Sequence, residues 1–304
     1  MRNIHIYNPK AGLGKGKKKE GMQTGDSPSA LSHVTTGIRD AGDFIREACK
    51  ENPDTLFTVY GGDGTICEAV NGIMEAGAGE TARLTVVPTG SGNDFVRNFP
   101  SSGEQKEYRI DLIDLDGMYA ANVVNVGFDC SVVAKTDAMR ANGLVTGGFS
   151  YILGVMAVLV EQYGIRLEVE LTDESGDVSV CDGEFMLCAI ANGAYYGGGF
   201  KAAPAASPES GVLDVILIRK ISRARFLKLV GDYKAGRHVD AESGVPFDRF
   251  QDIVVYKKCL KAVVRGMEEV CVDGEVMKKK ELVATPCPKA IRFLYPANAS
   301  DILR

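Results

Sequence analysis

The chain has 304 residues, of which 45% are apolar and 25% charged, the balance of an ordinary folded protein. This length gives a prior of two domains. The formal net charge of −5 provides no overall basic field, so nucleic acid is not an expected partner. The eight cysteines lack C-x-x-C spacing and are predicted to be reduced thiols of a cytoplasmic protein.

The first third of the chain alternates short apolar runs with glycine-rich loops and helical patterns. Strands are predicted at residues 4–7, 56–60 and 84–87. Apolar residues at helical spacing lie between them, beginning at Ile38 for the first helix and Ile66 for the second. This repetition predicts an α/β domain with a parallel sheet. Residues 13–32 have little periodicity and are predicted to be a loop or a frayed helix.

The remainder of the chain has more predicted strands than helices. Strands are predicted at residues 120–126, 166–171, 185–190, 212–218, 262–264 and 291–295. Helices are predicted near 149–163 and 222–235. Many strands with few crossover helices indicate an antiparallel, sandwich-like second domain. The boundary is predicted near Asp116-Gly117, which gives domains at 1–117 and 118–295, with a tail at about 296–304 packing back on the first domain.

Three glycine-rich loops follow the three predicted parallel strands. They read NPKAG at residues 8–12, GGDGT at 61–65 and TGSGND at 89–94. Ligands bind at the carboxyl ends of strands in open α/β sheets, and helix starts with free N–H groups favour phosphate. Neither the P-loop motif nor G-x-G-x-x-G occurs. The loops therefore predict a different phosphate-binding edge, with ordinary strand-to-helix turns as the alternative.

Acidic residues inside these loops indicate a metal–nucleotide complex. Asp63 lies among the glycines of the second loop, and Asp94 ends the third. A carboxylate beside phosphate is repelled unless a divalent cation lies between them, and Mg²⁺ takes one or two carboxylates plus phosphate oxygens. Asp111 is a third candidate. For Asp63, the alternative is a turn or helix-capping role.

The pair Asp273-Gly274 follows an apolar run and has two interpretations. Asp-Gly is a strong hairpin signal on its own. An acid on such a turn can also accept the proton of an attacking hydroxyl, as phosphoryl transfer requires.

Together these residues resemble the diacylglycerol kinase catalytic family, in its bacterial soluble lipid kinase branch with an NAD kinase-like nucleotide fold. GGDGT alone also occurs in NAD kinases and phosphofructokinases, but NPKAG before it and PTGSGNDF after it make the pattern strongly specific. The matching segments occur in family order, at residues 8–12, 61–65, 88–95, 125–129, 197–200 and 273–275.

The resemblance implies ATP- and Mg²⁺-dependent transfer of the γ-phosphoryl group to a lipid hydroxyl, with diacylglycerol giving phosphatidate as the first expectation. The cleft would lie between an α/β nucleotide domain and a β-sandwich. Asp273 would be the general base, with Glu275 beside it. Nucleotide contacts would come from Asn8, Pro9, Lys10, Ala11, Gly12, Thr35, Gly61, Gly62, Asp63, Gly64, Thr65, Glu68, Thr89, Gly90, Ser91, Gly92 and Asn93. Metal sites would involve Asp63, Asp94 and Asp111, with a structural Mg²⁺ at Ser207, Ser210 and Val212.

Three residues depart from the family pattern. Ser91 stands where the family usually has Thr and keeps the hydroxyl, while Cys67 stands where Asn is frequent. Ser210 replaces an acid that helps to hold the structural Mg²⁺, so that second metal site is in doubt. Two other functions stay open: an NAD kinase-like enzyme, and a catalytically silent nucleotide- or lipid-binding regulator.

The resemblance also implies a membrane lipid substrate and peripheral contact with the inner membrane surface. Candidate contacts are an apolar helix near 149–160 and basic stretches at 15–19, 219–225 and 278–280. A core helix and a solvated charged surface are the alternatives. His238 is predicted to lie at the surface. A homodimer through paired sheet edges is left open.

Overall fold

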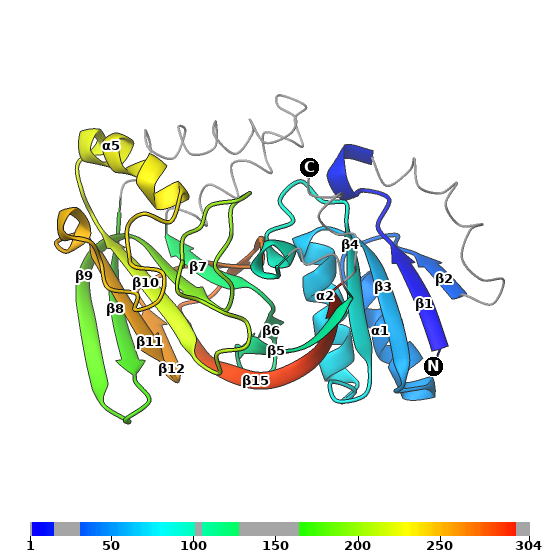
Figure 1. Ribbon diagram of the computed structural model, residues 1–304. Helices are drawn as coiled ribbons and strands as arrows, with labels where there is room; N and C mark the ends of the chain where they lie inside the picture. The colour runs from blue at the N-terminus through cyan, green and yellow to red at the C-terminus, as the bar shows by residue number, and fades with distance from the viewer. Residues whose placement is uncertain (1, 15–30, 101–104, 128–163, 296–304) are drawn as a thin grey trace.

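The structure is a computed structural model that describes residues 2–14, 31–100, 105–127 and 164–295. Two lobes lie side by side and are joined by the long curved strand β15 (Glu281–Tyr295), as Figure 1 shows. Within the described residues, fifteen strands form one hydrogen-bonded sheet that passes through both lobes. The predicted helix near 149–163 and the tail at 296–304 lie outside the described residues.

The N-terminal lobe has the predicted parallel sheet with its crossover helices. Four strands run parallel in the order β2-β1-β3-β4, with bounds β1 (Arg2–Tyr7), β2 (Leu31–Val34), β3 (Thr55–Gly61) and β4 (Arg83–Pro88). Its helices are α1 (Asp40–Glu51), α2 (Asp63–Glu75) and the short 3-10 turns η1 (Ala11–Gly14) and η3 (Phe95–Asn98). The α/β fold is confirmed.

The helical boundary predicted at Ile38 is wrong. Helix α1 begins at Asp40, after Arg39 adopts a left-handed φ of 66°. Ile38 therefore precedes the helix and is 84% exposed. The rest of the pattern holds, because Ala41, Ile45 and Ala48 recur at helical spacing and are buried against the sheet.

Two glycines set the distance between α1 and α2. A Cβ atom on Gly72 would lie 2.4 Å from the main-chain oxygen of Gly42, so the helices pack backbone to backbone at this point. The contact fixes the last turn of α2 against the first turn of α1.

The C-terminal lobe is antiparallel and sandwich-like, as predicted. Its strands are β6 (Tyr119–Ala120), β7 (Val123–Gly127), β8 (Ile165–Thr172), β9 (Val178–Ala191), β10 (Leu213–Arg219), β11 (Val254–Cys259), β12 (Lys261–Arg265), β13 (Glu269–Val272) and β14 (Glu275–Lys278). Helix α5 (Arg223–Lys234) confirms the helix predicted near 222–235, and a 3-10 turn, η4 (Asp248–Phe250), follows it. Within the described residues, no helix has the length and apolarity needed to cross a membrane.

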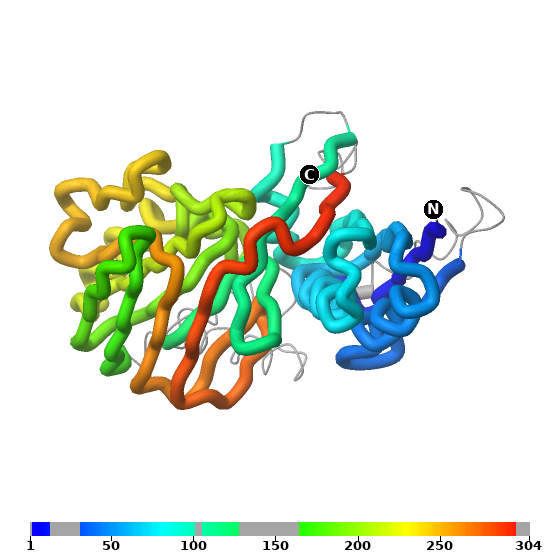
Figure 2. Tube along the Cα trace, turned by 90° about the horizontal axis from the view of Figure 1, so that it is seen from below, coloured from blue at the N-terminus to red at the C-terminus, as the bar shows by residue number. Residues whose placement is uncertain are grey.

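Strand β15 connects the two lobes. Its first part pairs antiparallel with β12 of the C-terminal lobe, and its last part pairs parallel with β4 of the N-terminal lobe. Along most of its length it also pairs with β5 (Lys106–Asp114), which the sequence patterns did not predict. Figure 2, in which the molecule is seen from below, shows β15 crossing from one lobe to the other. The two lobes therefore share a continuous hydrogen-bonded base beneath the space between them.

Candidate active site

A cavity of about 1010 Å³ lies between the lobes and is lined by both of them. The N-terminal lobe contributes the three glycine-rich loops, Glu68 and residues 35–38. The C-terminal lobe contributes residues around 122–125, 196–200 and 271–275 and one face of α5. Many of the predicted nucleotide, catalytic and metal residues line this one space. They are Asn8, Lys10, Ala11, Gly12, Thr35, Gly62, Asp63, Gly64, Thr65, Glu68, Gly90, Ser91, Gly92, Asp94, Asp273 and Glu275.

The glycine-rich loops are held at the carboxyl ends of their strands by main-chain contacts. The N–H of Asn8 donates to the carbonyl of Tyr60 at 3.0 Å, and that of Thr89 donates to Gly61 at 2.9 Å. A Cβ atom on Gly90 would lie 2.5 Å from Cα of Gly62, so the second and third loops touch through backbone alone. Four of the predicted nucleotide-binding residues belong to these loops but do not line the cavity. They are Pro9, Gly61, Thr89 and Asn93.

The start of α2 faces the cavity with main-chain N–H groups available for an anion. Its capping residue is Gly62, which has no side chain with which to cap the helix. Asp63 does not cap the helix either, because its Oδ1 accepts the N–H of Phe95 at 3.0 Å. The capping role considered for Asp63 is therefore wrong, and no side chain of the described residues caps this helix start.

Asp63 and Asp94 flank Gly92 and face the same point. A Cβ atom on Gly92 would lie 3.0 Å from Oδ2 of Asp63 and 3.3 Å from Oδ2 of Asp94. Burial, and then the negative charge of Asp63, raise the pKa of Asp94 to about 6. Two carboxylates that repel one another beside a phosphate-type loop fit a divalent cation that takes its remaining ligands from phosphate and water.

Asp273 occupies the turn between β13 and β14, where both Asp273 and Gly274 have positive φ. Its Oδ1 accepts the N–H groups of Asn122 at 3.0 Å and Val123 at 2.9 Å, and its Oδ2 accepts that of Ala121 at 2.6 Å. A carboxylate has about four acceptor positions. Three N–H groups use part of this capacity, and the thiol of Cys67 is a further hydrogen-bonding neighbour of the carboxylate. Asp273 is both a hairpin residue and an acid of the cavity.

The electrostatic surroundings of the hairpin acids favour their protonated forms. Burial outweighs the three N–H donors and raises the pKa of Asp273 to about 6. The pKa of Glu275 is also raised, first by burial and then by the charge of Glu68, with Arg39 opposing. Glu68 itself accepts the N–H of Ala41 at 3.1 Å and so helps to cap α1.

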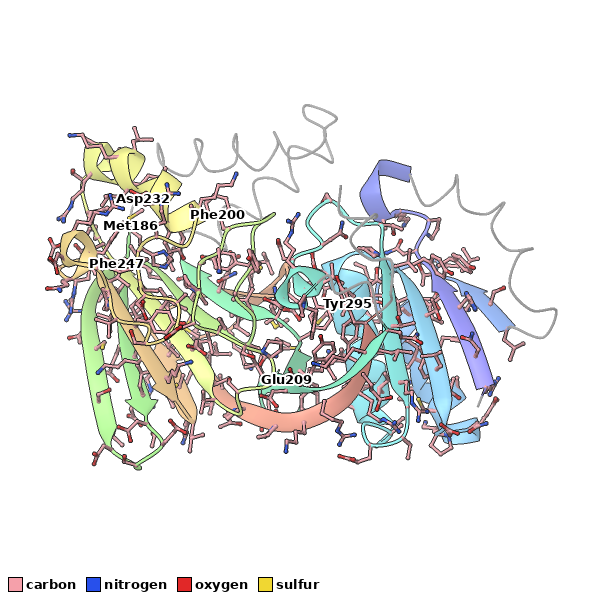
Figure 3. The ribbon with its side chains drawn as sticks, viewed as in Figure 1. Met186, Phe200, Glu209, Asp232, Phe247 and Tyr295 are labelled. Atoms are coloured by element: carbon pink, nitrogen blue, oxygen red, sulfur yellow. The ribbon has the colours of Figure 1, made fainter. Side chains whose placement is uncertain are left out.

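Two parts of the cavity were not assigned by the sequence patterns. The apolar side chains of Phe226, Leu227 and Val230 line it from α5, and Phe200 lies close to that helix (Figure 3). Gly198 and Gly199 donate to Asp94 from the C-terminal lobe. The helix and the GGGF segment were both recognised in the sequence, but their spacing does not reveal which face meets the cavity.

Comparison with known proteins agrees with this architecture. Residues 2–126 match the diacylglycerol kinase catalytic domain, and residues 122–295 match the YegS C-terminal NAD kinase beta sandwich-like domain. The chain belongs to the diacylglycerol kinase catalytic family. Its relatives are lipid kinases, so the protein is an enzyme of the lipid kinase family.

Individual relatives cover most of the chain. The diacylglycerol kinase of Bacillus subtilis is 28% identical over 295 residues, which is 89% of this chain and 88% of the relative. A Shewanella frigidimarina protein named "Probable lipid kinase YegS-like" is 26% identical over 279 residues, covering 86% and 82%. A solved structure of a diacylglycerol kinase from Bacillus anthracis covers 97% of both chains with a TM-score of 0.65 at 19% identity, which shows the shared fold.

Cys67, which stands where Asn is frequent in the family, lies beside the acids Asp273 and Glu275. Its thiol donates weakly to the carbonyl of Tyr119 at 3.7 Å. Burial, and then the charge of Asp273, raise the pKa of the thiol well above its usual value. Cys67 is therefore a neutral neighbour of Asp273 and not a nucleophile.

Asp111 was predicted to share a metal site with Asp63 and Asp94, but it is not among the residues that line the cavity and lies instead with the predicted structural-metal residues. Asp111, Ser207, Ser210 and Val212 come together where β5 meets the 203–212 loop. Asp111 accepts the N–H groups of Gly211 and Lys289, and Ser210 donates to the carbonyl oxygens of Ser207 and Val212. Ser210 brings a neutral hydroxyl to this set where the family has a carboxylate.

His238 lies in the interior of the protein and not at its surface. It is fully buried, and a ring nitrogen lies 2.9 Å from the carbonyl oxygen of Ala202. Burial lowers its pKa to about 4, so the ring is neutral near pH 7. It packs at 4.6 Å from the ring of Tyr233 on α5. The surface position predicted for it is wrong because the loop after α5 folds back under the helix.

Proposed function

We propose that the protein is an ATP-dependent lipid kinase that transfers the γ-phosphoryl group of ATP to a lipid hydroxyl, with diacylglycerol as acceptor and phosphatidate as product. The observation that carries this proposal is the cavity, which combines phosphate-type loops, a buried acid and an apolar wall. The corresponding role would be in phospholipid metabolism.

The nucleotide would bind against the N-terminal lobe. The free N–H groups at the start of α2 and the glycine backbone of residues 89–92 suit phosphate oxygens. Thr35 is held at the cavity edge because its N–H donates to the carbonyl of Tyr7 at 2.8 Å. Lys10 adds a positive charge to the same edge.

Magnesium would be held by Asp63 and Asp94, whose carboxylates face one point beside Gly92. When bound, the ion would neutralise phosphate charge during transfer. Two protein carboxylates suit Mg²⁺, which keeps water and phosphate oxygens among its ligands.

Asp273 would act as the general base. Three N–H donors fix its carboxylate, which in its ionised form can accept the proton of the attacking hydroxyl. A pKa of about 6 keeps most of the group ionised at pH 7 while leaving it more basic than an ordinary aspartate.

The apolar wall of α5 favours a lipid acceptor over NAD. Phe226, Leu227 and Val230 offer a surface for hydrocarbon chains, whereas the ribose and pyrophosphate of NAD would call for polar partners. Helix α5 also carries Lys228 and Lys234, while its Arg225 is paired with Asp252 at 2.7 Å, and lysines at this surface suit an anionic bilayer. We therefore propose peripheral contact with the inner membrane surface.

We further propose that residues 1–117 form the nucleotide domain and 118–295 the lipid domain. Two of the predicted membrane segments, 15–19 and 149–160, lie outside the described residues. The homodimer stays a prediction that size measurement in solution can test.

The test is phosphate transfer from labelled ATP to a panel of lipids in mixed micelles with Mg²⁺, with NAD as a parallel acceptor. We expect a labelled lipid. Asp273→Asn is expected to bind ATP near normally and to lose transfer, while Glu269→Gln on the same hairpin keeps it. Label in NAD would contradict the proposal, and tight ATP binding without any labelled acceptor would favour the silent regulator.

A further inference from the structure

The loop at residues 203–212 lies at the junction of the two lobes, above β15, where Figure 3 labels Glu209. The family resemblance places a structural divalent ion here. We infer that this chain holds the loop without that ion and that the ammonium group of Lys258 supplies the positive charge in its place. The inference concerns folding and does not depend on the acceptor lipid or on ATP.

The predicted ligand oxygen atoms take part in hydrogen bonds within the loop. The hydroxyl of Ser210 donates to the carbonyl of Val212 at 3.2 Å, and the N–H of Ser210 donates to the carbonyl of Ser207 at 3.1 Å. A neutral hydroxyl also stands where the family has a carboxylate.

Asp111 serves as a main-chain fastener instead of a ligand. Its Oδ2 accepts the N–H of Gly211 at 2.6 Å, and its Oδ1 accepts that of Lys289 at 2.7 Å. Its own N–H donates to the carbonyl of Pro208 at 2.7 Å. One residue therefore ties the loop to β5 and β15.

Lys258 holds the other end of the loop. Its ammonium group lies 2.9 Å from Oδ1 of Asp214 and donates to the carbonyl of Ala205 at 3.0 Å. Tyr256 donates to the same Asp214 oxygen at 2.7 Å. Asp214 is fully buried, so its charge requires a cation nearby. The ammonium group thus meets a loop carbonyl and a carboxylate that flank the predicted ligands along the chain, and its charge opposes a second cation there.

The first test compares thermal unfolding in millimolar Mg²⁺ and in EDTA. It uses the full chain with Asp63→Asn, which removes metal binding at the catalytic cavity from the comparison. We expect the same Tm in both solutions, and no stoichiometric divalent metal in the gel-filtered protein. A Tm lower in EDTA by several degrees, or one retained ion per chain, would overturn the inference.

The second test, also in the Asp63→Asn protein, removes the ammonium group of Lys258 and then restores a carboxylate that can hold a metal ion. Lys258→Met is expected to lower Tm by about 5 °C with or without Mg²⁺, while Lys257→Met on the same strand changes it little. Lys258→Met with Ser210→Asp restores a carboxylate to the loop, and Mg²⁺ is then expected to raise Tm by about 5 °C. An unchanged Tm in Lys258→Met, or no rescue by Mg²⁺ in the double variant, would contradict the assignment.

Discussion

The carboxylate of Asp94, in the N-terminal lobe, accepts the N–H of Gly198, in the C-terminal lobe, at 2.7 Å. Its second oxygen accepts the N–H of the next residue, Gly199, also at 2.7 Å. Gly197, Gly198 and Gly199 have φ values of 62°, 80° and 99°, a conformation that glycine adopts without strain. One side chain thus holds a glycine loop of the other lobe across the cavity.

Replacing Asp94 by asparagine tests this connection. An amide group keeps one acceptor oxygen but presents N–H hydrogens to a second N–H donor, so one of the two contacts becomes repulsive. We expect the Asp94→Asn protein to lose at least about 100-fold in kcat/KM and about 2 kcal/mol in the free energy of unfolding. Steady-state kinetics and urea unfolding measure the two effects. Asp116→Asn, at an exposed turn, is the control, and equal losses there would refute the interpretation.

The pH dependence of activity follows from the acid at the hairpin turn. Asp273 must be ionised to accept a proton, and its pKa is raised to about 6. We expect kcat/KM to rise with pH between 5 and 7, with its midpoint near pH 6. Initial rates in a constant-ionic-strength buffer series measure this profile. A profile that stays flat down to pH 4.5 would exclude Asp273 as the titrating base.

Stability is expected to change with pH in the opposite sense. The folded pKa values of Asp94 and Asp273, about 6 each, lie above the unfolded value near 4. Between pH 4 and 6 the folded state therefore binds more protons than the unfolded state, and the contribution of these groups to stability falls as pH rises. Urea unfolding of wild type and Asp94→Asn across this range checks the sign, because the variant is expected to lose part of the slope. An equal slope in both proteins would contradict the raised pKa of Asp94.

The contact between the second and third glycine-rich loops predicts the effect of a single methyl group. In Gly90→Ala, the new Cβ would meet Cα of Gly62 at 2.5 Å, so the loops must move apart. We expect ATP affinity to fall by at least about tenfold with a modest loss of stability. Calorimetric titration of ATP measures this. Gly117→Ala, at a turn that does not line the cavity, is the control, since its Cβ would meet nothing within 4 Å, and a similar loss of ATP affinity there would count against the explanation.

The apolar wall of the cavity predicts a substitution that separates the two substrates. Leu227 lines the cavity from α5 and is 55% exposed, so Leu227→Glu is compatible with folding. A carboxylate at this position would have to be desolvated against a hydrocarbon chain. We expect KM for long-chain lipid to rise about tenfold while KM for ATP stays unchanged. Leu260→Glu, at a residue that does not line this cavity in the described part of the chain, is the control. If Leu227→Glu and Leu260→Glu change the KM for lipid equally, α5 does not form part of the lipid site.

Local patterns in the sequence determined the elements of the fold. Period-two and period-3.6 apolar patterns, together with glycine punctuation, predicted β1, β3, β4, α2 and α5, because these features depend on neighbours along the chain. The order of the glycine motifs was also sufficient for the family, since each motif is a short contiguous segment. The nucleotide edge follows from the parallel sheet, in which every loop leaves from the same end.

Only the tertiary structure decided how distant segments meet. Asp273 is anchored by N–H groups some 150 positions earlier in the chain, and Asp94 by glycines about a hundred positions later. No spacing rule links such segments, because β15 and the antiparallel pairing of the second lobe bring them together. The burial of His238 and the assignment of Lys258 to the 203–212 loop have the same origin. They depend on which surfaces pack, and that is settled by the burial of whole elements rather than by any local pattern.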